Sequence, residues 1–198
     1  ERSISYNPRS ASDLVKESPE VCWLVNGILP VNGSMVLVGD AGSGKTWLTM
    51  ALAIDVDQGK PWLGQFKTHQ AKVLVIDEEN ANQLLKKRLE QLQRGARMNP
   101  DCSSLGVEFL TAQGVNLSDD ASISAVDMML DRHRPDLVII DALVRIHRGN
   151  ENDAMEMAKV FSVIKRWMVT YDCAFVFCHH RRKPGPTGND PNSMFRGS

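Results

Sequence analysis

The sequence has few cysteines, almost no net charge and no long apolar run without charges. Its four cysteines, Cys22, Cys102, Cys173 and Cys178, form no C-x-x-C pair and are too few for a disulfide scaffold in 198 residues. We therefore expect small buried thiols in a reducing compartment. A formal net charge of −1 argues against a surface coated with basic side chains, so any contact with nucleic acid should be local.

Membrane proteins and disordered proteins are excluded on similar grounds. No uncharged apolar run approaches the roughly 18 residues of a membrane span, and the first residues lack the apolar core of a signal peptide. With 42% hydrophobic residues the chain is too apolar to stay unfolded. These observations predict a cytoplasmic globular domain with no membrane partner.

Short apolar runs alternate with longer helical patterns along the chain. Strands are predicted at residues 34–38, 72–76, 107–110, 137–140 and 174–178, and the lack of alternation in these runs indicates strands covered on both faces. Periodic apolar residues predict helices at residues 45–58, 83–97, 123–134 and 154–171. The predicted fold is α/β, a doubly wound and mainly parallel sheet with flanking helices. We expect an N-terminal arm at residues 1–20 and the domain at residues 21–198.

A phosphate-binding motif follows the first predicted strand. Residues 39–46 match G-x-x-x-x-G-K-[ST] at every fixed position. Glycines let the backbone wrap around a phosphate with its N–H groups pointing inward, and the helix that begins near Lys45 directs its positive end to the same charge. Lys45 is expected at the β- and γ-phosphates, and Thr46 at Mg²⁺. The expected nucleotide-binding residues are Gly39, Asp40, Ala41, Gly42, Ser43, Gly44, Lys45, Thr46 and Trp47.

Two other predicted strands end in carboxylates. Asp141 directly follows residues 137–140 and is expected to hold Mg²⁺ through its water shell. Hydrolysis also needs a carboxylate that polarises the attacking water, and the residues after Asp141 are apolar. Three acids, Asp77, Glu78 and Glu79, follow residues 72–76 and can supply that carboxylate. By residue type alone, either Glu78 or Glu79 fits the role.

This combination resembles the RecA-like P-loop ATPases, most closely the RepA-type hexameric replicative helicases of the DnaB/KaiC superfamily. The resemblance extends over most of residues 21–198, and its segments are residues 23–30 (WLVNGILP), 39–46, 73–80, 137–147, 175–180 and 196–198 (RGS). It implies that Glu79 is the catalytic base, with Glu78 as the alternative. It also implies that His179 or His180 senses the γ-phosphate and that Arg196 serves the nucleotide of a neighbouring subunit in a homo-oligomeric ring. The family continues beyond the equivalent of Ser198, so we expect a domain truncated at its C-terminal end.

Basic loops are the candidate contacts for single-stranded DNA. Residues 179–198 carry four basic residues against one acidic residue, and a mobile basic loop in this position resembles the DNA-contacting loop of RecA-like motors. Residues 145–152 are a second candidate. A further group of basic residues is expected to form only the polar face of an amphipathic helix; its members are Lys86, Lys87, Arg88, Arg94 and Arg97.

The sequence thus predicts Mg²⁺-dependent ATP hydrolysis coupled to DNA unwinding or translocation in replication or recombination. The alternative is a KaiC-like regulatory ATPase that switches a protein partner without nucleic acid. A small-molecule P-loop kinase is less favoured, because three acids beside the phosphates suit activation of water. A zinc site at Cys178, His179 and His180 is disfavoured, because neighbouring strand residues point to opposite faces of a sheet.

Overall fold

The computed structural model describes residues 6–96, 104–147 and 154–180. Within these residues, five parallel strands form one sheet in the order β3–β7–β6–β4–β5, which confirms the predicted fold class. The strands are β1 (Trp23–Val25), β2 (Leu29–Pro30), β3 (Ser34–Gly39), β4 (Val73–Asp77), β5 (Glu108–Thr111), β6 (Leu137–Asp141) and β7 (Ala174–His180). The helices are α1 (Ala11–Glu17), α2 (Lys45–Gln58), α3 (Asn82–Gly95), α4 (Asp120–His133) and α5 (Ala154–Tyr171), with a 3₁₀ turn η1 (Leu143–Arg145).

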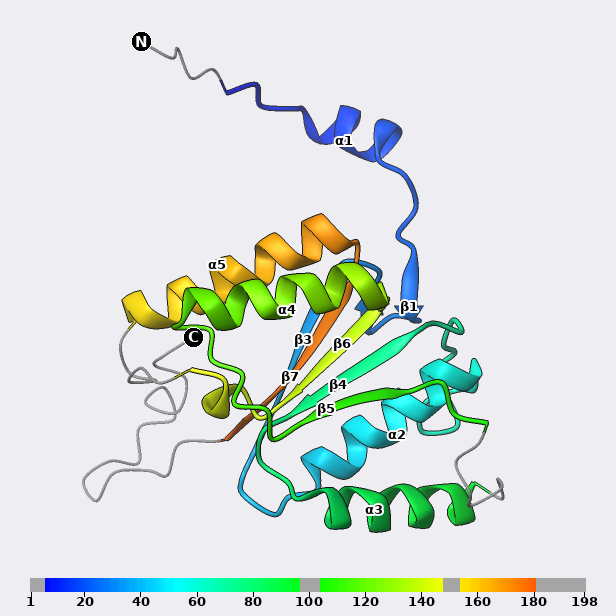
Figure 1. The fold of residues 1–198 in the computed structure, drawn as a ribbon. Helices are drawn as coiled ribbons and strands as arrows, with labels where there is room; N and C mark the ends of the chain where they lie inside the picture. Colours follow the sequence, from blue (N-terminus) through cyan, green and yellow to red (C-terminus); the bar gives the residue numbers. More distant parts are fainter. Residues whose placement is uncertain (1–5, 97–103, 148–153, 181–198) are drawn as a thin grey trace, which may run out of the picture.

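The sheet lies between two layers of helices. In Figure 1, α4 and α5 run side by side over one face, and α2 and α3 cover the other. Each interface has its own apolar core. Phe175 and Phe177 pack under α4 and α5, whereas Val176 packs under α2, as the alternation of side chains along β7 requires. Even-numbered residues of β7 therefore face the layer of α2, and odd-numbered residues face the layer of α4 and α5.

The three central strands are buried on both faces, as predicted, but the edge strands are not. Every residue of β4 and β6 is buried, and so are the first five of β7. In β3, half-buried and exposed positions alternate, and Val36 and Val38 are 47% and 54% exposed. The expectation of full cover was wrong for β3 and β5, which are the two edge strands of the sheet that the described residues form.

A short hairpin and a short helix lie in regions for which the sequence predicted no element. The strands β1 and β2 form a small antiparallel hairpin before β3, and Leu24, Val25 and Leu29 of this hairpin join the core under α2. Helix α1 falls within the predicted arm. All of its residues are exposed, and it stands away from the sheet in Figure 1. Its cap is local, since the Ser10 side chain accepts a hydrogen bond from the Asp13 N–H.

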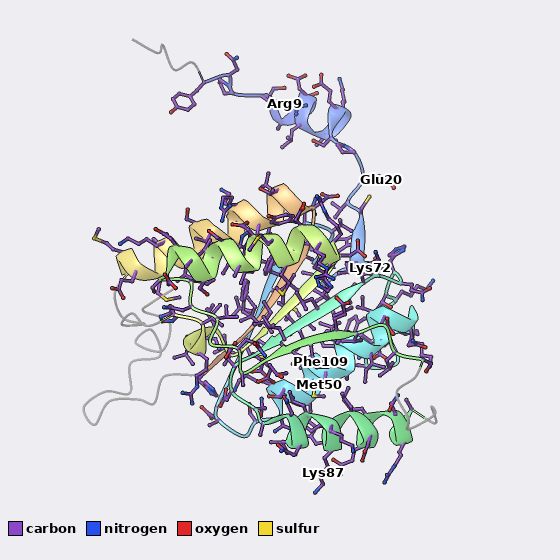
Figure 2. The ribbon with its side chains drawn as sticks, viewed as in Figure 1. Arg9, Glu20, Met50, Lys72, Lys87 and Phe109 are labelled. Atoms are coloured by element: carbon purple, nitrogen blue, oxygen red, sulfur yellow. The ribbon has the colours of Figure 1, made fainter. Side chains whose placement is uncertain are left out.

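Helix α3 has the predicted polar face with one exception. Lys86, Lys87 and Arg94 are exposed, and Figure 2 shows Lys87 pointing away from the body of the protein. Arg88 is instead partly buried and turns toward α2. Across the described parts of the chain, no helix combines the length and the apolar character that a membrane crossing needs.

Candidate nucleotide site

The site lies where the carboxyl ends of four parallel strands meet. Gly39, the last residue of β3, pairs with His180 at the end of β7. Asp77, the last residue of β4, pairs with Asp141 at the end of β6. Because all of these strands run in the same direction, their last residues share one edge of the sheet, where open α/β sheets bind ligands.

The phosphate loop between β3 and α2 has the backbone geometry of an anion cradle. Gly42 and Gly44 have φ angles of 76° and 92°, which only glycine adopts without strain. A Cβ on Gly39 would lie 2.7 Å from the Ser43 hydroxyl oxygen, so this glycine allows a close approach within the loop. Helix α2 begins at Lys45 directly after Gly44, and its N-terminal N–H groups open toward the loop. The Lys45 ammonium donates hydrogen bonds to the carbonyls of Gly39 and Asp40, each at 2.9 Å.

Asp141 has the properties of a buried metal-binding carboxylate. Its side chain is 3% exposed, and its Oδ2 has no hydrogen-bond partner among the described residues. Burial raises the pKa of Asp141, a hydrogen bond with Thr46 lowers it, and the Asp77 carboxylate raises it again. A Mg²⁺ ion fits these residues, since the free carboxylate oxygen and the hydroxyl are hard oxygen ligands and a cation would offset the burial of the negative charge.

The three consecutive acids that begin at the last residue of β4 make different contacts. Asp77 is buried, and its Oδ1 accepts hydrogen bonds from the N–H groups of Glu79 and Asn80 at 3.0 and 2.7 Å. The Glu78 carboxylate accepts three backbone N–H bonds from residues 113–115, at 3.0 to 3.1 Å. These bonds hold the Glu78 side chain at the loop after β5. The Glu79 side chain lies instead on the side of the phosphate loop, where it contacts His180.

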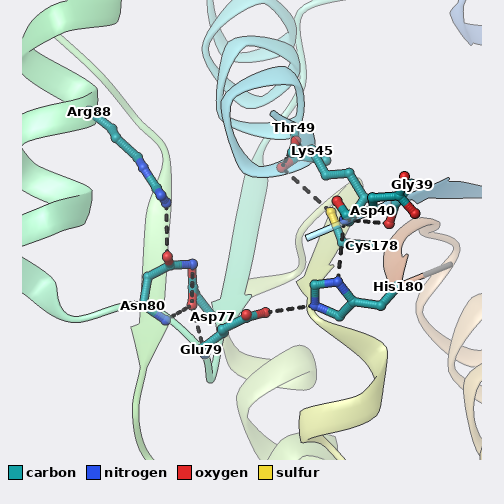
Figure 3. A network of polar contacts seen from close by, with 10 residues as sticks. All are labelled: Gly39, Asp40, Lys45, Thr49, Asp77, Glu79, Asn80, Arg88, Cys178 and His180. Carbon is teal, nitrogen blue, oxygen red and sulfur yellow. Dashed lines mark hydrogen bonds and ion pairs between the residues drawn. The ribbon is translucent and has the colours of Figure 1, made fainter. Parts of the chain in front are cut away.

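Glu79 and Lys45 are joined through His180. The Glu79 carboxylate lies 3.3 Å from Nε2 of His180, and the Lys45 ammonium lies 3.5 Å from Nδ1 of the same ring (Figure 3). An ammonium can only donate, so Nδ1 accepts and Nε2 carries the proton that it donates to Glu79. The three side chains form a polar chain across the mouth of the site.

His179 lies on the opposite face of the sheet from His180. It follows Phe175 and Phe177 on the face toward α5, whereas His180 shares the face of Cys178, whose thiol contacts the Thr49 hydroxyl of α2. Burial raises the pKa of Cys178 to about 12, which keeps the thiol protonated and unsuited to metal. Within the described residues no cluster of three metal-ligating side chains occurs.

The contacts of Arg88 were missed by the sequence analysis. The guanidinium donates a 2.9 Å hydrogen bond to the Asn80 side chain and lies 5.8 Å from the centre of the Trp47 ring. Asn80 in turn donates to both carboxylate oxygens of Asp77, as Figure 3 shows. These residues come from three separate elements, so no spacing along the chain signals that they meet. The one signal in the sequence was a basic residue, Arg88, in the predicted helix that follows the acids at residues 77–79.

Several candidate residues lie outside the described residues. They are Arg196 and the basic residues Arg181, Arg182 and Lys183, together with residues 148–152 of the second predicted DNA loop. The structure therefore places Lys45, Thr46, Glu79, Asp141 and His180 together at the phosphate loop, and places His179 on the other face.

Comparison with known proteins places the chain in a family. A family model described as an AAA domain matches residues 1–186. The chain belongs to the AAA domain family. Membership indicates a P-loop ATPase that binds and hydrolyses nucleotide. A search of curated proteins finds no match to the chain.

Proposed function

We propose that this AAA domain is the Mg²⁺-dependent ATP-hydrolysing core of a RecA-like DNA motor. The observation that carries the proposal is the meeting of the phosphate loop, Asp141 and Glu79 at one edge of the sheet. Two acids from neighbouring strands there face a loop built to hold phosphates, which is the arrangement that phosphoryl transfer to water requires.

The residues divide the reaction between them. Glu79 accepts a proton from a water molecule while the water oxygen forms a bond to the γ-phosphorus, and the bond from that phosphorus to the bridging oxygen breaks, so that nucleoside diphosphate leaves with the electron pair. Lys45 exchanges the carbonyls of Gly39 and Asp40 for phosphate oxygens. Thr46 and Asp141 would hold Mg²⁺, which neutralises charge on the β- and γ-phosphates.

His180 is the better candidate of the two histidines for the γ-phosphate sensor. Its ring lies between Lys45 and Glu79, the two groups whose partners change when phosphate binds and leaves. The chain passes directly from His180 into residues 181–183, which are all basic. A change in the orientation of the ring can therefore be passed to a segment suited to contact with a DNA backbone.

The proposal is tested by phosphate release from Mg²⁺-ATP with and without single-stranded DNA. We expect slow basal release that DNA accelerates and that added salt suppresses, since the contacts are mainly with backbone phosphates. Lys45→Ala should abolish both tight nucleotide binding and turnover. Replacement of Arg181, Arg182 and Lys183 by alanine should leave basal release unchanged and remove the stimulation.

Two outcomes would contradict the proposal. Nucleotide hydrolysis that is indifferent to DNA, with nucleotide-dependent binding of another protein, would favour the regulatory ATPase. Transfer of the phosphoryl group to a small acceptor in place of free phosphate release would favour a kinase.

A further inference from the structure

An aromatic side chain lies exposed directly beside the phosphate loop. Trp47 is the first residue after Thr46 and is 37% exposed. The Arg88 guanidinium lies 5.8 Å from the centre of this ring, within the range of a cation–π contact. Arg88 is itself fixed by its hydrogen bond to Asn80. The ring is therefore supported by the same network that shapes the loop carrying Glu79.

A cavity of about 470 Å³ opens beside this ring. Its apolar wall includes Trp47, Leu48 and Leu63, and its other side is formed by Ser43, Gly44 and Lys45 of the phosphate loop. The cavity is thus continuous with the proposed phosphate site. Its size is that of a small-molecule pocket, and its apolar wall suits a flat aromatic group rather than a charged one.

We propose that Trp47, held by Arg88, is the stacking platform for the nucleobase of the bound nucleotide, and that the adjoining cavity receives the base. This inference rests on the proposed function, because the triphosphate in residues 39–46 is what brings a base to the ring. The side chains that form the wall are apolar, so the base is held by its face rather than read at its edge. We therefore expect purine and pyrimidine triphosphates to bind with affinities within about tenfold of one another.

The test separates the base from the phosphates. Affinities for ATP and for inorganic tripolyphosphate, both with Mg²⁺, are measured by calorimetry for the unmodified chain and for Trp47→Ala, Trp47→Phe and Lys45→Ala. Loss of a stacking partner should weaken ATP binding by roughly 10- to 100-fold. Trp47→Ala should show that loss for ATP and none for tripolyphosphate, and Trp47→Phe should restore most of the affinity. Lys45→Ala should lose both ligands, which tests the phosphate site independently.

Tryptophan fluorescence gives a second readout that does not depend on affinity. ATP should quench part of the emission of the unmodified chain, and tripolyphosphate should not. The quenching should disappear in Trp47→Phe at saturating ATP, and should persist in Trp23→Phe, which changes a tryptophan of β1.

The proposal is overturned by any of three results. Equal losses for ATP and tripolyphosphate in a folded Trp47→Ala would make the ring a support for the loop. Unchanged ATP affinity in that variant would place the base elsewhere. A strong preference for one base would require edge recognition that this cavity wall does not offer. If Lys45→Ala loses both ligands and none of these three results occurs, the experiments support both the phosphate site and the stacking role of Trp47.

Discussion

At the scale of single residues, neighbouring carboxylates differ in the hydrogen bonds that they already make. Glu78 and Glu79 are adjacent, yet one accepts three backbone hydrogen bonds and the other contacts a histidine beside the phosphate loop. Asp77 and Asp141 are neighbours across the sheet, yet Asp77 satisfies the N–H groups of a turn whereas one oxygen of Asp141 has no partner among the residues described. Hydrogen bonds already made by a carboxylate limit what else it can bind.

Asp141→Asn should separate metal binding from folding. Because burial raises the pKa of Asp141, its protonated form is favoured in the folded state, and its contribution to stability falls as pH rises past the ordinary pKa of an aspartate toward the raised value. The amide of the Asp141→Asn variant does not ionise, so the variant does not lose stability at this position as the pH rises. We expect a higher melting temperature at pH 7.5 without Mg²⁺, and a difference that shrinks near pH 4.

In the same variant, the increase in nucleotide affinity on addition of Mg²⁺ should be about 10- to 100-fold smaller than in the unmodified chain. Thermal unfolding and nucleotide titrations with and without Mg²⁺ measure the two effects. A variant that is less stable than the unmodified chain at pH 7.5, or whose nucleotide affinity still responds fully to Mg²⁺, would contradict this role for Asp141.

A second carboxylate, Asp55 in α2, gives a pH dependence outside the site. Burial raises the pKa of Asp55 to about 6, against the lowering effect of Lys60 and of the Leu63 N–H. The folded state therefore favours the protonated form, and the stabilising contribution is lost as pH rises from about 4 through 6. Asp55→Asn should raise the free energy of unfolding by roughly 1–2 kcal/mol at pH 7.5, a value reduced for solvent screening, and should have little effect at pH 4. Urea denaturation at the two pH values checks it, and an equal effect at both would be a contradiction.

At the scale of elements, one carboxylate of α4 accepts hydrogen bonds from three side chains of α5. Asp127 of α4 accepts hydrogen bonds from Arg166 at 2.8 Å, from the Trp167 indole at 2.7 Å and from the Tyr171 hydroxyl at 3.0 Å. Burial alone would raise the pKa of Asp127, but these donors hold it below its usual value. Trp167 is almost fully buried, so the loss of its acceptor leaves an unpaired N–H in the core.

Asp127→Ala should therefore lower the free energy of unfolding by about 1–3 kcal/mol, with nucleotide affinity unchanged once the protein is folded. The matched control is Asp131→Ala on the same helix. Asp131 pairs only with exposed Arg134 among the contacts described, so its removal should cost about 0.5 kcal/mol or less. Chemical denaturation compares the two. Similar losses in both variants would show that the α4–α5 contact does not depend on Asp127.

The sequence predicted elements well where one local pattern decides them. The bounds of α2 and α5 agree with the prediction, since glycines flank α2 and apolar residues repeat along one side of α5. It failed where the outcome depends on distant residues. An apolar run such as β3 has the composition of a central strand, and only the strand order shows that it is an edge. Residue type alone left Glu78 and Glu79 open, and Glu79 was preferred only through the family resemblance. The contacts of Glu78 with residues 113–115, which lie far along the chain, could not be predicted from the sequence.

At the scale of the whole molecule, the order of the strands assembles the site. Among the described strands, β7 is the last in sequence but lies between β3 and β6, so His180 is inserted between the phosphate loop and the strand that ends in Asp141. Strand β4 lies on the other side of β6 and brings Glu79 to the same edge. Residues separated by about a hundred positions thus form one polar chain, and no single element carries the site.

The central claim is that Glu79, and not its neighbour Glu78, activates the water that attacks the nucleotide. The direct measurement is phosphate release from Mg²⁺-ATP by Glu79→Gln and Glu78→Gln, with ATP affinity and melting temperature determined on the same samples. We expect Glu79→Gln to bind ATP normally and to lose about 100-fold or more of kcat. Glu78→Gln should melt at a lower temperature, because its three backbone bonds are weakened, and should still turn over. Normal turnover by Glu79→Gln, or a folded Glu78→Gln that binds ATP without hydrolysing it, would contradict the account.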